Sequence, residues 1–423
     1  MTALDPAEGL LGWLAEQRET QQCVVTPIAL RDSREWQLVD GAIRHRTGRY
    51  FSVVGVEDDA TGWQAPLLEQ REIGTLAFIR RERAGQVEIL VQAKLEPGDL
   101  GLSQLAPSVQ ATASNLERVH GGAAQPFADL VSPQSQRDAD SLQSEQGTRF
   151  LGKLNRNVLV TADIPSGELP TNLRWAPAQE VLAATHIHHA INTDARSVLV
   201  TAPWELLTAQ APFSRGRDAW SAALETSYQL VRTGQPELAR EQITKLRAGV
   251  EPQVLDLDQL SGWSLDLDGS VTLKGGEFVV RQIGVETNAR EVAHWDQPII
   301  DSGDQVRADL LVSVLNGVAY FDLSPSVEAG LVHRAEWGPT RLHATTTPAP
   351  ATDGRVLAQV SQSDEGGRFF QDVTQYRLVR VDLPEPGPGQ IRLTLGELKP
   401  LLAQGGWLTN EARSVLSLLL RWL

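Results

Sequence analysis

Cysteine is almost absent from this sequence, since Cys23 is the single one among 423 residues. One cysteine excludes an internal disulfide and is typical of a protein in a reducing cytosol. Long apolar runs are absent too, because none approaches the roughly 18 residues of a membrane-spanning helix. The opening residues, MTALDPAEGLLGWL, contain acids and no basic segment, so no signal peptide is expected. Together these absences predict a cytoplasmic protein with no membrane partner.

Positive charge is scarce as well. The 38 lysines and arginines are outnumbered by 53 acids, which gives a formal net charge of −15. Nucleic-acid binding draws much of its affinity from cations against phosphates, so this composition argues against a nucleic-acid partner. Two nucleotide-binding motifs are also missing, because no GxGxxG follows an expected strand and there is no Walker motif.

The sequence does contain a long internal repeat, whose matching segments occur in the same order in both halves. They are Trp36 with Asp40-Gly41 and Trp263 with Asp268-Gly269, Trp63 with PLL (66–68) and Trp295 with PII (298–300), PSVQA (107–111) and PSVEA (325–329), EQGTRF (145–150) and DEGGRF (364–369), and ARSV at 195–198 and 412–415. This repeat is far longer than the roughly 20–50 residues of a solenoid repeat. The sequence therefore predicts two tandem modules, 1–203 and 251–423, joined by a connector, 204–250.

Hydrophobic periodicity predicts both helices and strands in each module. Strands are expected over 42–56, 73–82, 87–96 and 157–163. Helices are expected over 6–18, 178–185, 193–202, 395–404 and 410–423, with Thr193-Asp194 as the cap of the third. The connector is expected to be helical, mainly over 218–231 and 236–248.

A comparison of the two copies suggests which of them is active. From Trp63 to Pro107 there are 44 residues, whereas from Trp295 to Pro325 there are 30, so the second copy lacks the region holding AKLEPGDLGL. The same alignment places Asn115 opposite His333, His120 opposite Gly338, Asn155 opposite Thr374 and Asn157 opposite Tyr376. The first module keeps more polar residues, and we expect it to be catalytic and the second to be a degenerate copy.

Several long segments resemble one family closely, the NDP-hexose 2,3-dehydratases of deoxysugar biosynthesis. They are WQAPLLEQREIGTLAF (63–78), LVQAKLEPGDLGLSQLAPSVQAT (90–112), SNLERVHGG (114–122), LQSEQGTRFLGKLNRN (142–157) and SDEGGRFF (363–370). The resemblance covers nearly the whole chain. It implies an α/β (α+β) fold of two duplicated Nudix-like modules, with mixed sheets flanked by helices, and assembly as a homodimer.

The resemblance also implies an activity: loss of the C-2 hydroxyl from a dTDP-4-keto-6-deoxyhexose such as dTDP-4-keto-6-deoxyglucose, giving a 3,4-diketo-2,6-dideoxy sugar. The C-4 ketone acidifies the C-3 hydrogen, so a base, an acid and a donor to the enolate oxygen suffice. Neither a redox cofactor nor a metal is needed. Because the diketo product is unstable, a 3-ketoreductase is expected to act next, for an antibiotic or a glycan pathway.

Three residues are candidates for the chemistry. His120 in RVHGG lies beside two glycines that permit close approach to a ligand, and it could be the base. Glu145 could serve as acid or base, although Asp364 repeats it, which also suits a structural pair with Arg149. Lys94 could donate to the C-4 oxygen or to a phosphate. Each has a plainer alternative, a turn residue or a solvated strand end.

A second group of residues is expected to bind the substrate. Arg149 and Arg156 could pair with the pyrophosphate, because guanidinium groups match phosphate oxygens. Trp63 could stack on thymine, although Trp295 repeats it and core packing is the alternative. Four amides could contact the sugar or the thymine: Gln110, Asn115, Asn155 and Asn157. Two acids, Glu72 and Glu96, are weaker candidates.

Two segments of the sequence resemble metal sites. THIHHAIN (185–192) gathers three histidines, but its repeat partner has none, so no metal site is predicted. GWSLDLDGSV (262–271) lacks the spacing of a calcium loop. A metal-dependent Nudix-type hydrolase remains an alternative function, although the REUxEE-type carboxylate cluster of such enzymes is missing. The other alternative is a non-catalytic protein that binds nucleotide sugars for sensing.

Overall fold

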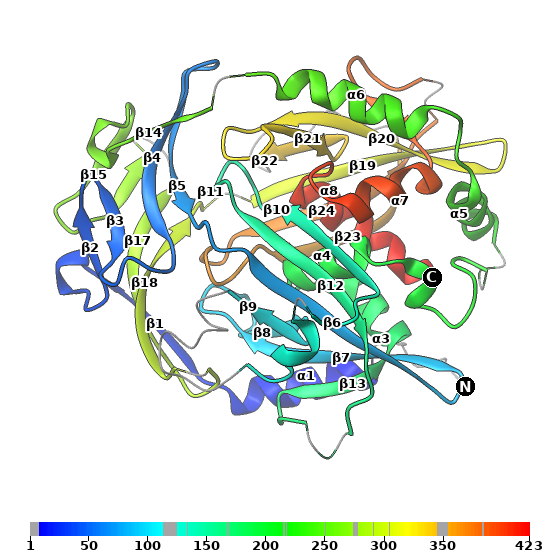
Figure 1. Ribbon diagram of the computed structural model, residues 1–423, viewed down its shortest axis with the longest axis horizontal. Helices are drawn as coiled ribbons and strands as arrows, with labels where there is room; N and C mark the ends of the chain where they lie inside the picture. The colour runs from blue at the N-terminus through cyan, green and yellow to red at the C-terminus, as the bar shows by residue number, and fades with distance from the viewer. Residues whose placement is uncertain are drawn as a thin grey trace.

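The computed structural model describes residues 8–112, 125–132, 134–165, 167, 169–214, 216, 218–249, 251–273, 278–290, 292–303, 305–344, 354–382 and 385–423. Among these residues, no helix is long and apolar enough to span a membrane. The strands form four sheets, two larger and two smaller. Figure 1 shows the two smaller sheets side by side at one end, and the larger sheets with most of the helices at the other.

Each larger sheet has seven strands and mixes parallel with antiparallel neighbours. The first contains β6 (Gly74–Arg83), β7 (Gln86–Leu95), β8 (Ser103–Ala106), β9 (Val109–Ala111), β10 (Ala139–Ser144), β12 (Leu154–Thr161) and β13 (Leu173–Pro177). The second contains β19 (Gln305–Leu315), β20 (Val318–Val327), β21 (Ala335–Gly338), β22 (Arg341–Ala344), β23 (Arg355–Ser363), β24 (Val373–Arg380) and β25 (Ile391–Leu393).

The two smaller sheets have six and five strands. The six-stranded sheet contains β2 (Trp36–Val39), β3 (Ala42–His45), β4 (Ser52–Asp58), β5 (Trp63–Glu69), β11 (Phe150–Leu151) and β14 (Gln253–Leu255). The five-stranded sheet contains β1 (Cys23–Ile28), β15 (Trp263–Leu265), β16 (Val271–Leu273), β17 (Val279–Thr287) and β18 (His294–Asp301).

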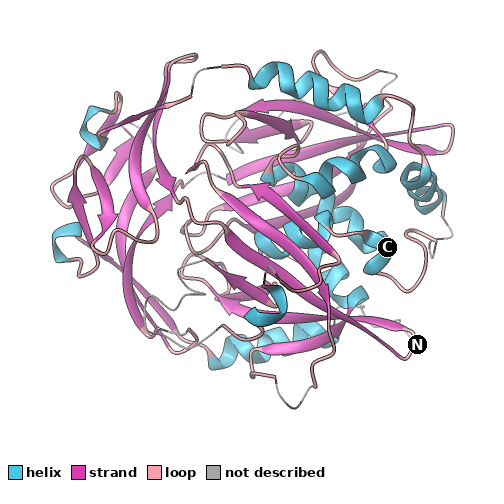
Figure 2. Ribbon diagram, viewed as in Figure 1, coloured by secondary structure: helices cyan, strands magenta, loops and turns pink. Residues whose placement is uncertain are grey.

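Helices cover the larger sheets and lie between them (Figure 2). They are α1 (Glu8–Thr20), α3 (Ala178–Ala183), α4 (Thr193–Thr201), α5 (Ala219–Gln229), α6 (Gln235–Arg247), α7 (Leu395–Gln404) and α8 (Asn410–Leu416). Short 3₁₀ turns lie at Leu30–Asp32, Ala128–Val131, Ala184–His186, Trp204–Leu206, Leu257–Gln259 and Ser417–Trp422. Helix α4 packs on β6 and β12, α8 packs on β19 and β24, and the two helices contact each other. The predicted mixed α/β fold is confirmed.

The two larger sheets repeat the same register, and this corrects the alignment made from the sequence. Strands β7 and β8 pair Leu95 with Ser103, and β20 and β21 pair Val327 with Ala335. PSVEA (325–329) is therefore the counterpart of AKLEP (93–97), not of PSVQA. The second module keeps the AKLEPGDLGL region and is instead shorter between β22 and β23. The correspondence of His120 with Gly338 and of Asn115 with His333 was wrong, since these residues of the second module match Ala106 and Gly101.

The modules also exchange strands. Strand β1 precedes β2 in the chain but pairs with β17 of the second module, whereas β14 pairs with β4 of the first. Two loops cross in the same reciprocal way: the Gly98 amide donates to the Gly366 carbonyl, and the Gly330 amide donates to the Gly147 carbonyl, each at 2.8 Å. A Cβ on Gly98 or Gly330 would collide with the backbone of the opposite module. The module boundaries remain a prediction, and the two halves interlock.

Most expected elements are present, with two corrections. The stretch 42–56 forms two strands, β3 and β4, because the chain turns back at 46–51. Helix α4 is capped by Asn192, whose side chain accepts from the Ala195 amide at 2.8 Å, and not by Thr193-Asp194. Asp194 is consequently available to face elsewhere. The histidines of THIHHAIN contact the second module, for instance His186 Nε2 at 2.6 Å from the Leu418 carbonyl.

Candidate functional site

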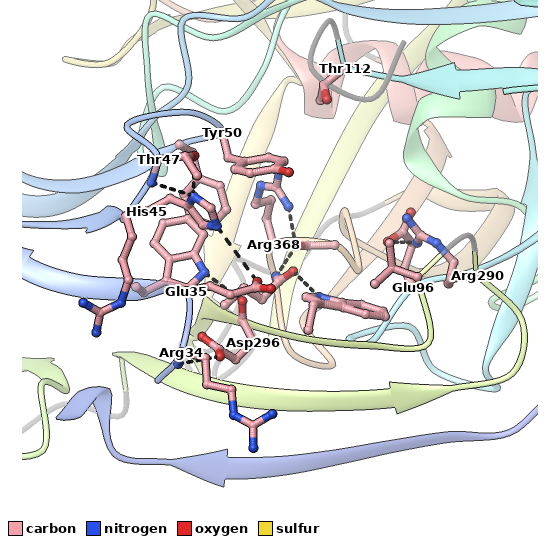
Figure 3. Close-up of a pocket in the computed structure, with 17 residues that line it drawn as sticks. Arg34, Glu35, His45, Thr47, Tyr50, Glu96, Thr112, Arg290, Asp296 and Arg368 are labelled. Atoms are coloured by element: carbon pink, nitrogen blue, oxygen red, sulfur yellow. Dashed lines mark hydrogen bonds and ion pairs between the residues drawn. The ribbon is translucent and has the colours of Figure 1, made fainter. Parts of the chain in front are cut away.

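Two adjoining cavities lie where the first larger sheet meets the smaller sheets and the DEGGRF segment (364–369). The outer cavity has a volume of about 490 Å³. Both modules contribute its aromatic walls and its arginines, namely Trp36, Tyr50, Phe51 and Trp295, and Arg34, Arg46, Arg290 and Arg368. Figure 3 shows Arg368 and Tyr50 in the middle of this cavity, with Arg290 and Glu96 on one side and His45 and Thr47 on the other.

The inner cavity is smaller, with a volume of about 80 Å³. Two lysines and three carboxylates line it, together with amide side chains and a short apolar strip: Lys94, Lys153, Glu96, Asp194, Glu365, Gln70, Gln110, Asn155, Leu76 and Ala111. Five residues line both cavities, Glu96, Thr112, Arg290, Gly367 and Arg368. Arg290 and Arg368, both from the second module, therefore stand at the junction between the cavities.

Glu96 holds two cations at this junction. Its carboxylate lies 2.8 Å from Arg290 Nη1 and 3.2 Å from Lys94 Nζ, and Lys94 also donates to the Gln110 carbonyl at 3.1 Å. Burial alone would raise the pKa of Glu96, but the charges of Arg290 and Lys94 hold it at about 2. Glu96 is thus ionised at neutral pH, and its role is to fix the positions of two positive groups.

Lys153 is the second lysine of the inner cavity. It is 4% exposed, and its Nζ donates to the Glu72 carbonyl at 2.8 Å. Burial lowers the pKa of Lys153, although the nearby carboxyl of Glu365 opposes this shift. Burial also raises the pKa of Asp194 well above its usual range, with Glu365 adding to the effect. The cavity therefore combines an amine inclined to lose its proton with a carboxyl inclined to keep one.

Glu145 lies behind the cavity wall rather than in it. One carboxylate oxygen accepts from Asn155 Nδ2 and the other from Asn410 Nδ2 of the second module, both at 2.8 Å. Burial and the charge of Glu365 raise the pKa of Glu145 to about 7. Asn155, which does line the cavity, is therefore held from behind by an acid.

The outer cavity has a polar floor beneath its aromatic walls. Trp36 Nε1 donates to the Asp296 carbonyl at 2.7 Å, and the Arg34 amide donates to the Asp296 carboxylate at 3.0 Å. The His45 ring lies edge-on to both Trp36 and Tyr50. Flat aromatic faces next to backbone and side-chain polar groups are suited to a planar heterocycle.

The residues predicted from the sequence are divided between the site and other places. Lys94, Glu96, Gln110 and Asn155 line the inner cavity, and Glu145 supports Asn155. Asn115 and His120 lie outside the described residues, in the segment that follows Thr112. The other predicted residues, Trp63, Glu72, Arg149, Arg156 and Asn157, are described but line neither cavity.

These five occupy structural positions. Trp63 packs beside Ala42, Val54 and Leu67. Arg149 stacks on Phe278, with 4.6 Å between its guanidinium carbon and the ring centre, and Arg156 pairs with Asp140 at 2.7 Å on the surface. Asn157 donates to Ser197 Oγ at 2.9 Å inside the protein, and Glu72 offers its backbone carbonyl to Lys153. The repeat partners of two of them reach the cavity instead: Arg368, brought there by the crossing of the loops, and Trp295 on β18.

Six residues that line the cavities were not predicted from the sequence: Lys153, Asp194, Glu365, Arg290, Arg368 and Trp295. Lys153 stands in the quoted segment LGKLNRN and is one of only five lysines, which was an available signal. Asp194 was assigned to a helix cap. The other four belong to the second module, which was regarded as degenerate.

At the matching positions, the second module has neither of the two lysines of the inner cavity. The strand registers and the loop hydrogen bonds place Ser326 opposite Lys94, Asp372 opposite Lys153, Leu342 opposite Gln110 and Thr374 opposite Asn155. Glu328 repeats Glu96, but burial raises its pKa to about 8, and it accepts from Ser326 and from the Gly147 amide. Both lysines are therefore specific to the first module.

Comparison with known proteins gives a consistent result. A family described as NDP-hexose 2,3-dehydratase matches residues 7–201 and 241–419. Three relatives named dTDP-4-dehydro-6-deoxy-alpha-D-glucopyranose 2,3-dehydratase align over nearly the whole chain. The one from Amycolatopsis orientalis is 29% identical over 97% of this chain and 89% of its own. Those from Streptomyces violaceoruber and Saccharopolyspora spinosa are 30% and 31% identical, over 97% and 96% of this chain and 96% and 89% of theirs. A solved structure described as an ADP compounds hydrolase covers 30% of this chain and 75% of its own, at 15% identity and a TM-score of 0.22.

Proposed function

Because the chain belongs to the NDP-hexose 2,3-dehydratase family, we propose that it removes water across C-2 and C-3 of a dTDP-4-keto-6-deoxyhexose. The observation that best supports this substrate is the position of Arg290 and Arg368 where the two cavities meet. Two guanidinium groups at that point suit a diphosphate. The nucleoside then occupies the aromatic outer cavity and the sugar the charged inner cavity.

The inner cavity offers each group that the elimination needs. Lys153 is the base that takes the C-3 proton, since burial favours its neutral form. Lys94, paired with Glu96, donates to the negative charge that develops on the C-4 oxygen. Asp194 gives its proton to the C-2 hydroxyl, which leaves as water while the C-2–C-3 double bond forms. The enol then takes a proton at C-2 and loses that of its C-3 hydroxyl, which yields the 3,4-diketo product.

The remaining features of the proposal rest on the family and on the internal repeat. The first module provides the reacting groups and part of the aromatic wall, and the second adds Trp295 and the two arginines at the junction, Arg290 and Arg368. We infer that the two modules arose by gene duplication. The proposal also includes a homodimer located in the cytoplasm. Its product would be passed to a 3-ketoreductase of an antibiotic or other deoxysugar pathway. His120 remains a second candidate for the base.

Mass spectrometry after incubation with dTDP-4-keto-6-deoxyglucose in the presence of EDTA tests this function. The proposal expects the loss of one water from the sugar nucleotide with the diphosphate intact. Cleavage of the diphosphate that depends on added metal would instead indicate a hydrolase. Tight binding of the unchanged substrate would indicate a sensing protein.

A further inference from the structure

One stretch of the inner cavity wall is built from two facing residues. Asn155 on β12 pairs with Gly74 on β6, and both line the cavity. A Cβ on Gly74 would lie 2.5 Å from Asn155 Oδ1, so a glycine is required for the amide to lie as it does. The other end of the amide, Nδ2, donates to Glu145. Nδ2 is therefore bound to Glu145 behind the wall, whereas Oδ1 lies beside Gly74, which lines the cavity.

The orientation is fixed from behind by a chain of hydrogen bonds. Glu145 accepts on both oxygens, from Asn155 Nδ2 and from Asn410 Nδ2. Asn410 in turn accepts from Thr193 Oγ1 at 3.2 Å, so its amide cannot turn over without losing this bond. An ionised carboxylate, which only accepts, satisfies both amides at once.

The repeat shows that these residues change together. In the second module Val306 stands in place of Gly74, Thr374 in place of Asn155 and Asp364 in place of Glu145. Thr374 Oγ1 lies 3.4 Å from the Asp364 carboxylate. The shorter threonine leaves room for the valine, and no amide faces the wall there. The glycine, the amide and the longer acid thus form one unit, which is present in the module that keeps both cavity lysines.

We propose that Glu145 is a positioning residue, which holds the Asn155 amide so that Oδ1 accepts a hydrogen bond from a hydroxyl group of the bound sugar. This inference rests on the proposed function, which places the sugar in the inner cavity. Because an acceptor cannot bond to a ketone oxygen, Asn155 recognises the C-2 or C-3 hydroxyl and not the C-4 oxygen. Glu145 itself does not touch the substrate.

Substitution of Glu145 by glutamine places two hydrogen-bond donors opposite each other. Glutamine has one acceptor and one donor, and Thr193 prevents Asn410 from turning, so the new donor faces Asn155 and forces that amide to reverse. Substitution of Asn155 by aspartate provides two acceptors instead. In the double variant this carboxylate accepts from the side-chain NH₂ of the introduced glutamine and still offers an oxygen to the cavity. In the single variant Asn155→Asp, two buried carboxyls face each other, which costs stability.

The test uses the full chain with Glu145→Gln, Asn155→Asp and both changes together. The melting temperature and the affinities for dTDP and for dTDP-glucose are measured, the latter two by calorimetry. The wild type should prefer dTDP-glucose to dTDP, and Glu145→Gln should reduce this preference about 5- to 10-fold while dTDP affinity stays within about 2-fold, as expected for one lost hydrogen bond. The double variant should regain both melting temperature and preference. Asp364→Asn is the matched control and should leave the preference unchanged.

Each other outcome overturns the inference. A double variant that stays as unstable as the single variants would show that the amides are not oriented by Glu145. Recovery of the melting temperature without the preference would show that Asn155 Oδ1 does not contact the sugar, and so would a wild type that binds dTDP and dTDP-glucose equally. The proposed function is tested separately: intact preference for dTDP-glucose without loss of water from the keto sugar would refute the dehydratase and leave this inference standing.

Discussion

Arg290 of the second module donates to Glu96 of the first at 2.8 Å, on the wall shared by the two cavities. This pair explains how an acidic chain can hold an anionic substrate. One carboxylate, Glu96, holds two cations, Arg290 and Lys94, so the group of three keeps a net positive charge for a diphosphate. It also means that neither module can form the site alone, since the acid comes from one and the arginine from the other.

Glu96→Gln should weaken substrate binding by about 10-fold or more, because Arg290 and Lys94 lose the charge that positions them. The change also affects stability against pH. The pKa of Glu96 is lowered to about 2 in the folded protein, so its stabilising effect is present above its ordinary pKa and is lost as the pH falls toward 2. The full effect is on the order of 3 kcal/mol. Between pH 7 and pH 3, the free energy of unfolding measured with urea should fall more for the wild type than for the variant. An equal fall in both proteins would contradict the stabilising role of ionised Glu96.

Arg368→Gln should reduce dTDP affinity by about 10- to 100-fold, because a half-buried guanidinium at the junction provides charge-assisted hydrogen bonds to phosphate. Arg149→Gln is the matched control. It alters the same position of the repeat, where the guanidinium stacks on Phe278 away from both cavities. Calorimetric titration with dTDP measures both. Equal losses in the two variants would show that the junction is not the diphosphate site.

Lys153→Arg tests whether Lys153 acts as a base or only provides a positive charge. Arginine remains protonated, so the variant should lose dehydration by at least about 100-fold while it still binds dTDP. In the wild type the rate should rise with pH through the lowered pKa of Lys153, because only the neutral amine accepts a proton. Steady-state rates from pH 5 to 9 measure this limb. Activity of Lys153→Arg close to that of the wild type would exclude Lys153 as the base and favour His120.

Asp58→Asn should lower the free energy of unfolding by about 3–5 kcal/mol, since it leaves the largely buried charge of Arg334 without its partner across the modules. Asp59→Asn is the control, because Asp59 is exposed and its change should stay within about 0.5 kcal/mol. Chemical unfolding gives both values. A small effect of Asp58→Asn would show that this ion pair does not hold the interlocked modules together.

The local elements were predictable from the sequence, but the composition of the site was only partly so. Helix α7 was expected at its observed bounds, since a double glycine follows it in the sequence, and the structure adds a Thr394–Glu397 capping box at its start. The choice of Arg149 over Arg368 was wrong for the cavity, because the two loops cross between modules and nothing in the local pattern reports such a crossing. Motif matching also aligned PSVEA with PSVQA, whereas strand register aligns it with AKLEP. Register depends on backbone pairing over the whole sheet, and a five-letter match does not determine it.

The most direct test of the account is NMR of the reaction with dTDP-4-keto-6-deoxyglucose in deuterated water. Abstraction at C-3 followed by tautomerisation predicts a product that has lost the C-3 hydrogen and one water and has gained one deuterium at C-2. Substrate that is recovered with its C-3 hydrogen unexchanged and its C-2 hydroxyl in place, under conditions where it binds, would contradict the proposed dehydration.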